Sequence, residues 1–174
     1  MAGATVSLAL AAALPLASAS ADPAAPDAQV KAGYLYKLAA FVRWPGPGPE
    51  LFRICVSGRA DIAAALTGLA HDRLAGGHRI AVAQLDRLRA QDAAHCQILF
   101  LGGGDGAAEG EMLDAVVGMP VLTVADRDAG ASGGVIEFFD RDGKLRLAVD
   151  RAAASAHRLE LSSKLVDAAV QVKP

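Results

Sequence analysis

Three short segments of the chain are apolar at nearly every position, and stretches with helical spacing separate them. The segments cover residues 51–56, 97–101 and 120–125. A strand that is apolar on both faces has to be covered on both faces, which is typical of a parallel sheet between two layers of helices. The intervening residues 60–70 and 109–117 have the spacing of such helices. We therefore expect a single three-layer α/β/α domain with a mostly parallel sheet.

Two weaker elements fit the same alternation of strands and helices. Residues 78–85 alternate in part between apolar and polar side chains and predict a further strand. Residues 88–94 predict a short helix before the strand at 97–101. Both connections are short enough for strands of one sheet.

The last third of the chain has a different pattern. Residues 135–139 and 145–149 are apolar runs on either side of Asp140-Arg141-Asp142-Gly143, and an Asp-Gly pair favours a tight turn. We expect an antiparallel hairpin that extends one edge of the parallel sheet. Asp150 can cap the segment that follows, where residues 152–170 predict one long helix or two short ones.

The segment before the first strand predicts a helix. Its apolar residues recur on one helical face, at Val30, Tyr34, Leu35, Leu38, Phe41 and Val42. Trp44-Pro45 ends this helix, and the glycines and prolines at 46–49 form a turn. Residues 22–29 are a polar lead-in segment, so the predicted domain covers residues 30–174.

The first 21 residues predict a cleavable signal peptide. The stretch 1–17 is apolar and uncharged in its side chains and too short to span a bilayer, and the small residues Ala17-Ser18-Ala19-Ser20-Ala21 offer cleavage sites at its end. No Lys or Arg precedes the apolar stretch, and an Ala-rich tail of a cytosolic protein is the alternative. We expect export from the cytoplasm, with no membrane insertion after cleavage.

The charges of the chain argue against a nucleic-acid partner. Its 17 basic and 19 acidic residues give a net charge of −2, and they are interspersed along the sequence. Neither a basic footprint for nucleic acid nor a polybasic patch for a membrane surface is present.

No group of residues matches a catalytic, metal or cofactor motif. The glycine cluster at 102–106 follows a strand, but it lacks the Lys-Ser/Thr of a P-loop and the spacing of a dinucleotide site. The four histidines are not at metal-ligand spacing. Ser162 and Ser163 precede Lys164 without the Ser-x-x-Lys spacing, and we expect them to bond to the backbone at a helix boundary. Asp126 and Asp128 lie in a turn-like stretch. We expect a protein that is not an enzyme and has no metal or cofactor.

The two cysteines, Cys55 and Cys96, have two interpretations. In an oxidising compartment an even pair favours a disulfide, and neighbouring strands would bring the two together. Two buried free thiols are the alternative.

Several short motifs, in a characteristic order, resemble the YfiR-like family. The first helix contains Tyr34-Leu35-Tyr36 and is followed by Trp44-Pro45. Further matching blocks follow in the family's order, at residues 54–58, 96–101, 121–126, 133–138 and 159–165. Together these blocks span nearly all of the chain that follows the signal peptide.

This resemblance implies a non-catalytic periplasmic regulator. Such a protein restrains a membrane-bound diguanylate cyclase through the periplasmic sensor domain of the cyclase, which lowers cyclic di-GMP output and biofilm formation. The resemblance also implies a homodimer, and it places Cys55 and Cys96 at cysteine positions of the family. The second cysteine pair of the best-known member has no counterpart in this sequence.

Exposed parts of the first helix and of the C-terminal segment are the candidate partner or dimer surface. The candidate residues are Tyr34, Tyr36, Trp44, Ser162, Ser163 and Lys164. Aromatic residues at helical spacing also occur in cores, so a core role is the alternative. Two other function classes remain: a periplasmic small-ligand sensor with a pocket near residues 102–106, and a hydrolase.

Overall fold

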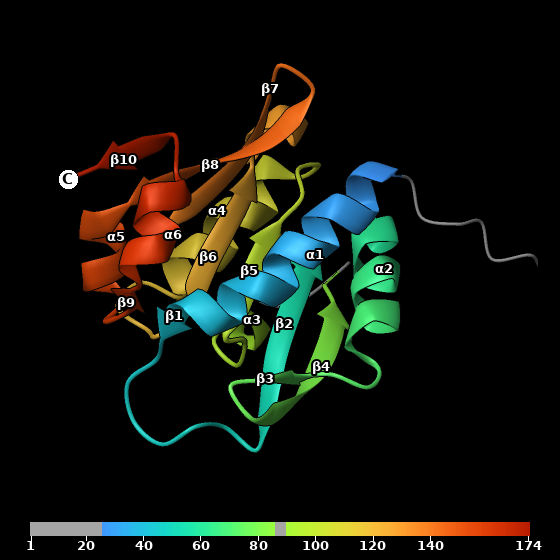
Figure 1. Ribbon diagram of the computed structural model, residues 1–174, viewed down its shortest axis with the longest axis vertical. Coiled ribbons are helices and arrows are strands. Elements are labelled where there is room, and N and C mark those ends of the chain that lie inside the picture. Colours follow the sequence, from blue (N-terminus) through green and yellow to red (C-terminus); the bar gives the residue numbers. More distant parts are fainter. Residues whose placement is uncertain (1–25, 86–89) are drawn as a thin grey trace, which may run out of the picture.

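The computed structural model describes residues 26–85 and 90–174 (Figure 1). Six helices lie in these ranges: α1 (Pro26–Phe41), α2 (Ala60–Ala70), α3 (Ala90–Ala93), α4 (Gly106–Ala115), α5 (Arg151–Ala156) and α6 (Ser163–Ala168). The strands are β1 (Val42–Arg43), β2 (Leu51–Ser57), β3 (Leu74–Ala75), β4 (His78–Gln84), β5 (Ile98–Leu101), β6 (Leu122–Asp126), β7 (Ile136–Arg141), β8 (Lys144–Asp150), β9 (Glu160–Leu161) and β10 (Gln171–Lys173). A 3-10 turn, η1 (Arg127–Ala129), follows β6.

The main sheet has eight strands in the order β10-β8-β7-β6-β5-β2-β4-β3. Its five central strands, β4, β2, β5, β6 and β7, are parallel. Numbered along the chain, they lie in the spatial order 2-1-3-4-5, so the connections reverse direction between β2 and β5. In sheets of this kind, the carboxyl ends of the strands at this switch point form the usual ligand crevice.

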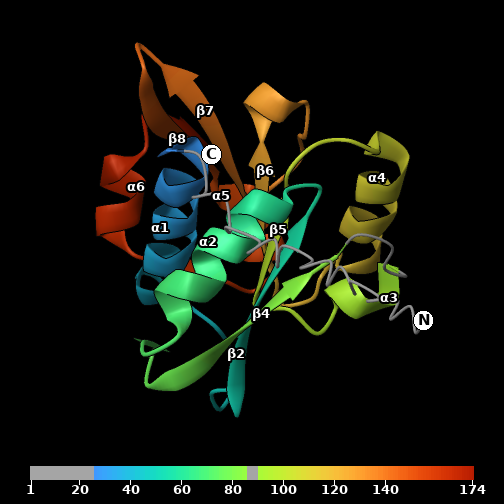
Figure 2. The same cartoon turned by 90° about the vertical axis from the view of Figure 1, so that its right-hand side faces the viewer.

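Helices cover both faces of the sheet, as the sequence predicts. Figure 2 shows α1, α2 and α6 on one side and α3 and α4 on the other. The side chains of each central strand alternate between the two layers. In β5, Ile98 and Phe100 join the core under α1 and α2, whereas Leu99 and Leu101 join the core under α4. The expected three-layer domain is confirmed.

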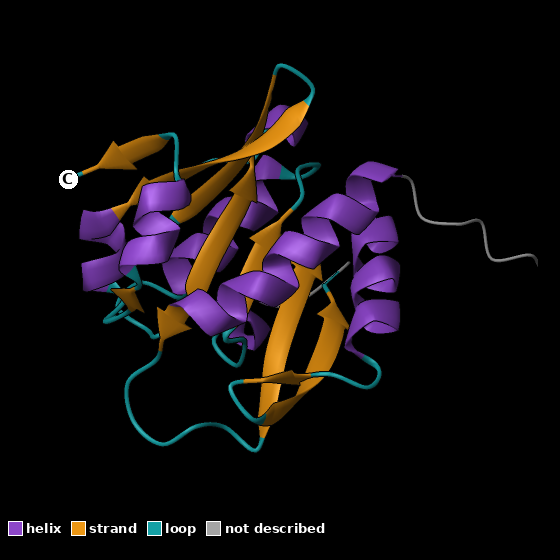
Figure 3. Cartoon of the chain, viewed as in Figure 1, coloured by secondary structure: helices purple, strands orange, loops and turns teal. Residues whose placement is uncertain are grey.

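The predicted hairpin is confirmed, and it projects beyond its neighbours at the top of Figure 3. Strands β7 and β8 pair antiparallel around Asp142 and Gly143, which both have positive φ. That conformation is the one that a two-residue Asp-Gly turn requires. The hairpin does not form the outermost strand on this side of the sheet, because β10 pairs with β8 in parallel.

Several element boundaries differ from those predicted. Helix α1 begins at Pro26, inside the predicted lead-in, because proline suits the first turn of a helix. Helix α4 begins at Gly106 because the Asp105 side chain caps it. The C-terminal segment forms two short helices, with β9 between them. The first residues of the helix predicted at 88–94 lie outside the described residues, and α3 covers only Ala90–Ala93.

The predicted signal peptide also lies outside the described residues. Within the part of the chain that the structure describes, no helix is long and apolar enough to cross a membrane.

Candidate functional site

The carboxyl ends of β2, β5 and β6 meet at the glycine segment that the sequence singled out. Gly103 has a φ of +80°, a conformation that glycine adopts without strain. A side chain at Gly103 would collide with the Ala129 carbonyl, and a side chain at Gly58 would collide with the Gly103 carbonyl. The loops after the three strands are therefore packed backbone against backbone.

The backbone donors of this segment are occupied by the protein's own carboxylates. The Gly103 N–H donates to Glu109 Oε1 at 2.8 Å. The Ala107 and Ala108 N–H groups donate to Asp105 Oδ1 at 3.1 and 3.2 Å. A phosphate at the start of α4 would need these same donors. The structure therefore places internal carboxylates where the predicted ligand pocket would hold an anion.

Glu109 is buried, with only 5% of the residue exposed. Burial raises the pKa of its carboxyl, and the hydrogen bond from Gly103 opposes that effect. The nearby negative charges of Asp105 and Asp126 raise the pKa further. Glu109 therefore binds a proton more readily than an exposed glutamate does.

Asp126 is fully buried at the end of β6, and the prediction that it lies in an ordinary turn was wrong. Its Oδ2 accepts a hydrogen bond from Lys31 Nζ at 2.6 Å, and only 6% of the Lys31 side chain is exposed. Its Oδ1 is the one buried side-chain oxygen of the described residues without a hydrogen-bond partner. The pair fixes the first half of α1 to the carboxyl edge of the sheet.

Further charges extend this pair toward the surface. Arg59 makes two hydrogen bonds of 2.8 Å to Asp61 and one of 3.0 Å to Asp27. Arg59 Nη1 lies 3.6 Å from Asp126 Oδ2. Burial alone would lower the pKa of Lys31, but hydrogen bonds to Asp126 and Asp27 raise it, so the ammonium stays charged. The hydrogen bonds from Arg59 likewise lower the pKa of Asp61.

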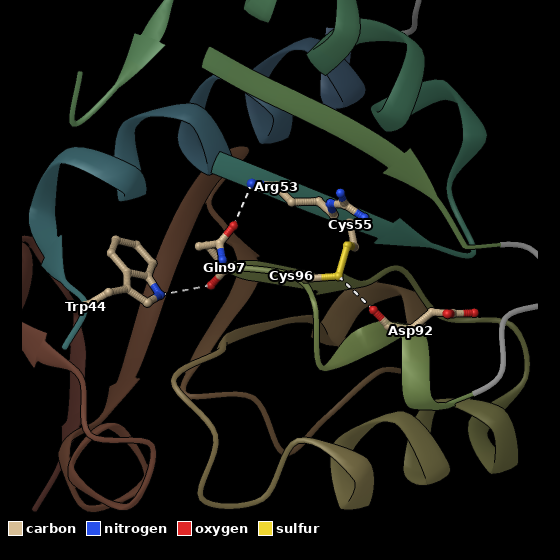
Figure 4. Close-up of a disulfide and its surroundings, with 6 residues drawn as sticks. All are labelled: Trp44, Arg53, Cys55, Asp92, Cys96 and Gln97. Carbon is tan, nitrogen blue, oxygen red and sulfur yellow. Dashed lines mark hydrogen bonds between the residues drawn. A yellow bond between two sulfur atoms is a disulfide. The ribbon is translucent and has the colours of Figure 1, made fainter. Parts of the chain in front are cut away.

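The predicted disulfide joins Cys55 in β2 to Cys96, just before β5, with 5.9 Å between their Cα atoms (Figure 4). Gln97, the next residue, connects the bridge to Arg53 of β2 and to Trp44, which follows β1. Its N–H donates to the Arg53 carbonyl, its side-chain oxygen accepts from the Arg53 N–H, and its carbonyl accepts from Trp44 Nε1 at 3.2 Å. Figure 4 shows Gln97 between the disulfide and the indole, with its side chain bonded to Arg53 and its carbonyl to Trp44. The alternative of two free thiols is excluded.

Two of the predicted surface residues lie at the opposite, amino edge of the sheet. Trp44 and Ser162 line a cavity of about 590 Å³ between the end of α1, the 45–50 loop and β9. The exposed ion pair between Arg43 and Glu160 lies on its wall. As expected, Ser162 caps a helix, because its hydroxyl accepts from the Leu165 N–H.

The other predicted surface residues are not gathered at this cavity. Tyr34 packs edge-on against Phe138 of β7, with ring centroids 6.0 Å apart. Tyr36 contacts β3, the outermost strand beside β4, where its hydroxyl donates to the Leu74 carbonyl. Ser163 and Lys164 are exposed on α6. The six residues therefore do not form one patch in a single copy of the chain.

The sequence analysis missed Lys31, Arg59 and Glu109. Lys31 shares the buried face of α1 with Leu35 and Leu38, and a lysine on such a face signals a buried partner. Asp126 is the last residue of a strand that is buried at every position, which is the matching signal. Within the described ranges, no group of three or more His, Cys, Asp or Glu side chains is arranged to hold a metal ion.

A comparison with curated proteins found no match. One solved structure, a conserved domain protein from Vibrio cholerae O1 biovar El Tor, has a TM-score of 0.49 and 12% sequence identity. The alignment covers 84% of this chain and 60% of that one. The family model described as YfiR/HmsC-like matches residues 28–170. These residues include nearly all of α1, the disulfide and all five parallel strands, so the chain belongs to the YfiR/HmsC-like family.

Proposed function

We propose that this protein is a non-catalytic periplasmic regulator that restrains a membrane-bound diguanylate cyclase. It binds the periplasmic sensor domain of the cyclase, which lowers cyclic di-GMP output and biofilm formation. The observation that carries this proposal is the family match over residues 28–170. Membership of the family supports a periplasmic signalling regulator. That its partner is a diguanylate cyclase is our proposal.

The closed disulfide supports the proposed compartment. Disulfides persist in oxidising environments such as the bacterial periplasm and are rare in the cytosol. Cys55 and Cys96 are each only 1% exposed, so the bridge is part of the core. A core that is built around a disulfide suits a protein that folds after export.

The amino edge of the sheet is the surface that we assign to the partner. Trp44 is half-buried on the cavity wall, and an aromatic side chain at a cavity can anchor a partner residue. Ser162, Ser163 and Lys164 extend this surface onto α6. Tyr34 and Tyr36 lie apart from this surface, on two sides of α1, and we assign them to the proposed homodimer contact.

The test measures cyclic di-GMP in cells that express a membrane-bound cyclase with a periplasmic sensor domain. Co-expression of this chain with its leader should lower cyclic di-GMP, and Trp44→Ala should weaken that effect. Glu111→Gln, an exposed change on α4, is the matched control and should act as the wild type. Unchanged cyclic di-GMP, together with no binding to the isolated sensor domain, would contradict the proposal.

The cavity beside Trp44 favours a second candidate, a periplasmic small-ligand sensor or binding module of another signalling pathway. Its volume of about 590 Å³ lies within the range of small-molecule sites, roughly 300–1,000 Å³. A thermal-shift screen on the purified chain would support this role if a ligand raised the Tm of the wild type but not that of Trp44→Ala. The sequence predicts such a pocket at the carboxyl ends of the strands instead, near residues 102–106.

A further inference from the structure

Glu109 is the buried carboxyl group on which the carboxyl edge of the sheet converges. Its partner, Gly103, lies in the loop after β5, and it contacts the loop after β2 at Gly58 and the loop after β6 at Ala129. The Glu109 side chain therefore reaches, through one hydrogen bond, the residue at which three loops meet.

The charges around Glu109 come from every element that packs against this junction. Asp105 at the start of α4 and Asp126 at the end of β6 are negative and act directly on Glu109. Arg59, in the loop after β2, and Lys31, in α1, are positive, but both are bound to Asp126. In η1, Arg127 pairs with Glu137, and Asp128 accepts from the Asp140 N–H. Within the described residues, no cation has a recorded ion pair with Glu109.

We infer that Glu109 is a proton-binding switch that controls the rigidity of the junction of the three loops. In the ionised state its carboxylate accepts a charge-assisted hydrogen bond from the Gly103 N–H. Such bonds are roughly twice as strong as those between neutral groups. When the carboxyl takes up one proton from solvent, the bond to Gly103 becomes a neutral one and the repulsion from Asp105 and Asp126 disappears.

The two effects of protonation act in opposite directions. The loss of repulsion and of buried charge stabilises the folded chain, since a charge without a cation partner is costly to bury. The weaker hydrogen bond loosens the Gly103 loop locally. Mild acid therefore leaves the protein folded but makes the loops at the carboxyl ends of the strands more mobile.

The Gly103 amide proton reports directly on this switch. The experiment is a pH titration of the purified chain, labelled with ¹⁵N and ¹³C. NMR follows the Gly103 amide and the Glu109 carboxyl carbon. We expect one shared titration with a midpoint above 4.5, the ordinary value. The Gly103 amide should move to the position of a weaker hydrogen bond, and its hydrogen exchange should become faster relative to that of the amides in β5.

Three variants make the result specific. Glu109→Gln should fix the neutral state, so that Gly103 keeps its low-pH shift at every pH. Asp105→Asn should lower the midpoint, because it removes one of the two neighbouring negative charges. Glu111→Gln, an exposed change on the same helix, should alter neither signal.

A midpoint at or below the ordinary value, or a Gly103 amide that does not follow the Glu109 carboxyl, would overturn the inference. If Glu109→Gln fails to fold, the wild type and Asp105→Asn still decide the question. A midpoint that Asp105→Asn leaves unchanged would show that the local charges do not control the proton. These outcomes are independent of the cyclase, because the titration uses the purified chain alone.

Discussion

Reduction of the Cys55–Cys96 bridge is the perturbation whose size follows most directly from the structure. The two cysteines are 41 positions apart in the sequence. In the chain-entropy model, opening a loop of that size returns about 13 cal/mol/K to the unfolded chain, or about 4 kcal/mol at 25 °C. Small domains have a total free energy of unfolding of about 5–15 kcal/mol, so the reduced protein should lose a quarter or more of it.

Urea unfolding of the oxidised and the reduced protein measures this difference. Because both sulfur atoms are buried, the protein should be reduced while unfolded and then refolded in reductant. The reduced chain should unfold at a lower urea concentration and with a steeper dependence on urea, since its unfolded state exposes more surface. The double variant Cys55→Ala, Cys96→Ala is the control and should respond to urea identically with and without reductant.

A loss below about 1 kcal/mol would refute this reasoning. It would mean that the unfolded chain keeps enough structure in this loop for the bridge to add little constraint. Measuring the Trp44 fluorescence in the same titration tests the local consequence. Because the indole N–H bonds to Gln97 next to the bridge, its environment should change on reduction even in the folded state.

Three further changes should affect the free energy of unfolding. Asp126→Ala should lower it by about 3–5 kcal/mol, because Lys31 is left charged and buried without its main partner. A thermal melt measures this loss, and a loss well below that range would show that the buried ion pair does not stabilise the fold in this way. Gly103→Ala should lower it by about 1–3 kcal/mol, because the new side chain would collide with the Ala129 carbonyl. Gly110→Ala in α4, where a new Cβ meets no atom within 4 Å, should instead raise it by about 0.5–1 kcal/mol. Equal effects of the two variants in urea titrations would contradict the close packing at Gly103. Arg158 has a φ of +56°, so Arg158→Gly should be more stable than Arg158→Ala by about 1 kcal/mol, and the reverse order of Tm values would show that the backbone is not strained there.

The central strands could be predicted because their signal is local. A strand buried on both faces has to be apolar at successive positions, as residues 98–101 are, and the helices between such strands follow from spacing. The Asp-Gly turn is also a local signal. Strands β1, β3, β9 and β10 could not be predicted, because two or three residues contain no periodicity and pair only where the rest of the fold places them.

The site was harder to predict because its contacts join distant parts of the sequence. Lys31 and Asp126 are 95 positions apart, and nothing in either neighbourhood identifies the other. The glycine cluster was recognised as a loop, but its packing depends on backbone atoms near Gly58 and Ala129. The disulfide, in contrast, was predicted, since one of the two cysteines lies in β2 and the other just before β5, and this topology makes those strands neighbours.

The carboxylate that bonds to Gly103 has a consequence for how this fold can evolve new binding. An anion from solution would compete with a group that is tethered six residues away and held by a helix. Tethered groups act at an effective concentration on the order of millimolar or higher, so only a ligand more abundant or much tighter than that would displace it. Removing Glu109 alone would not admit an anion, because Asp105 would still repel it. Fewer substitutions would therefore be needed to bind a new ligand at the amino ends of the strands, where Trp44 already borders an open cavity.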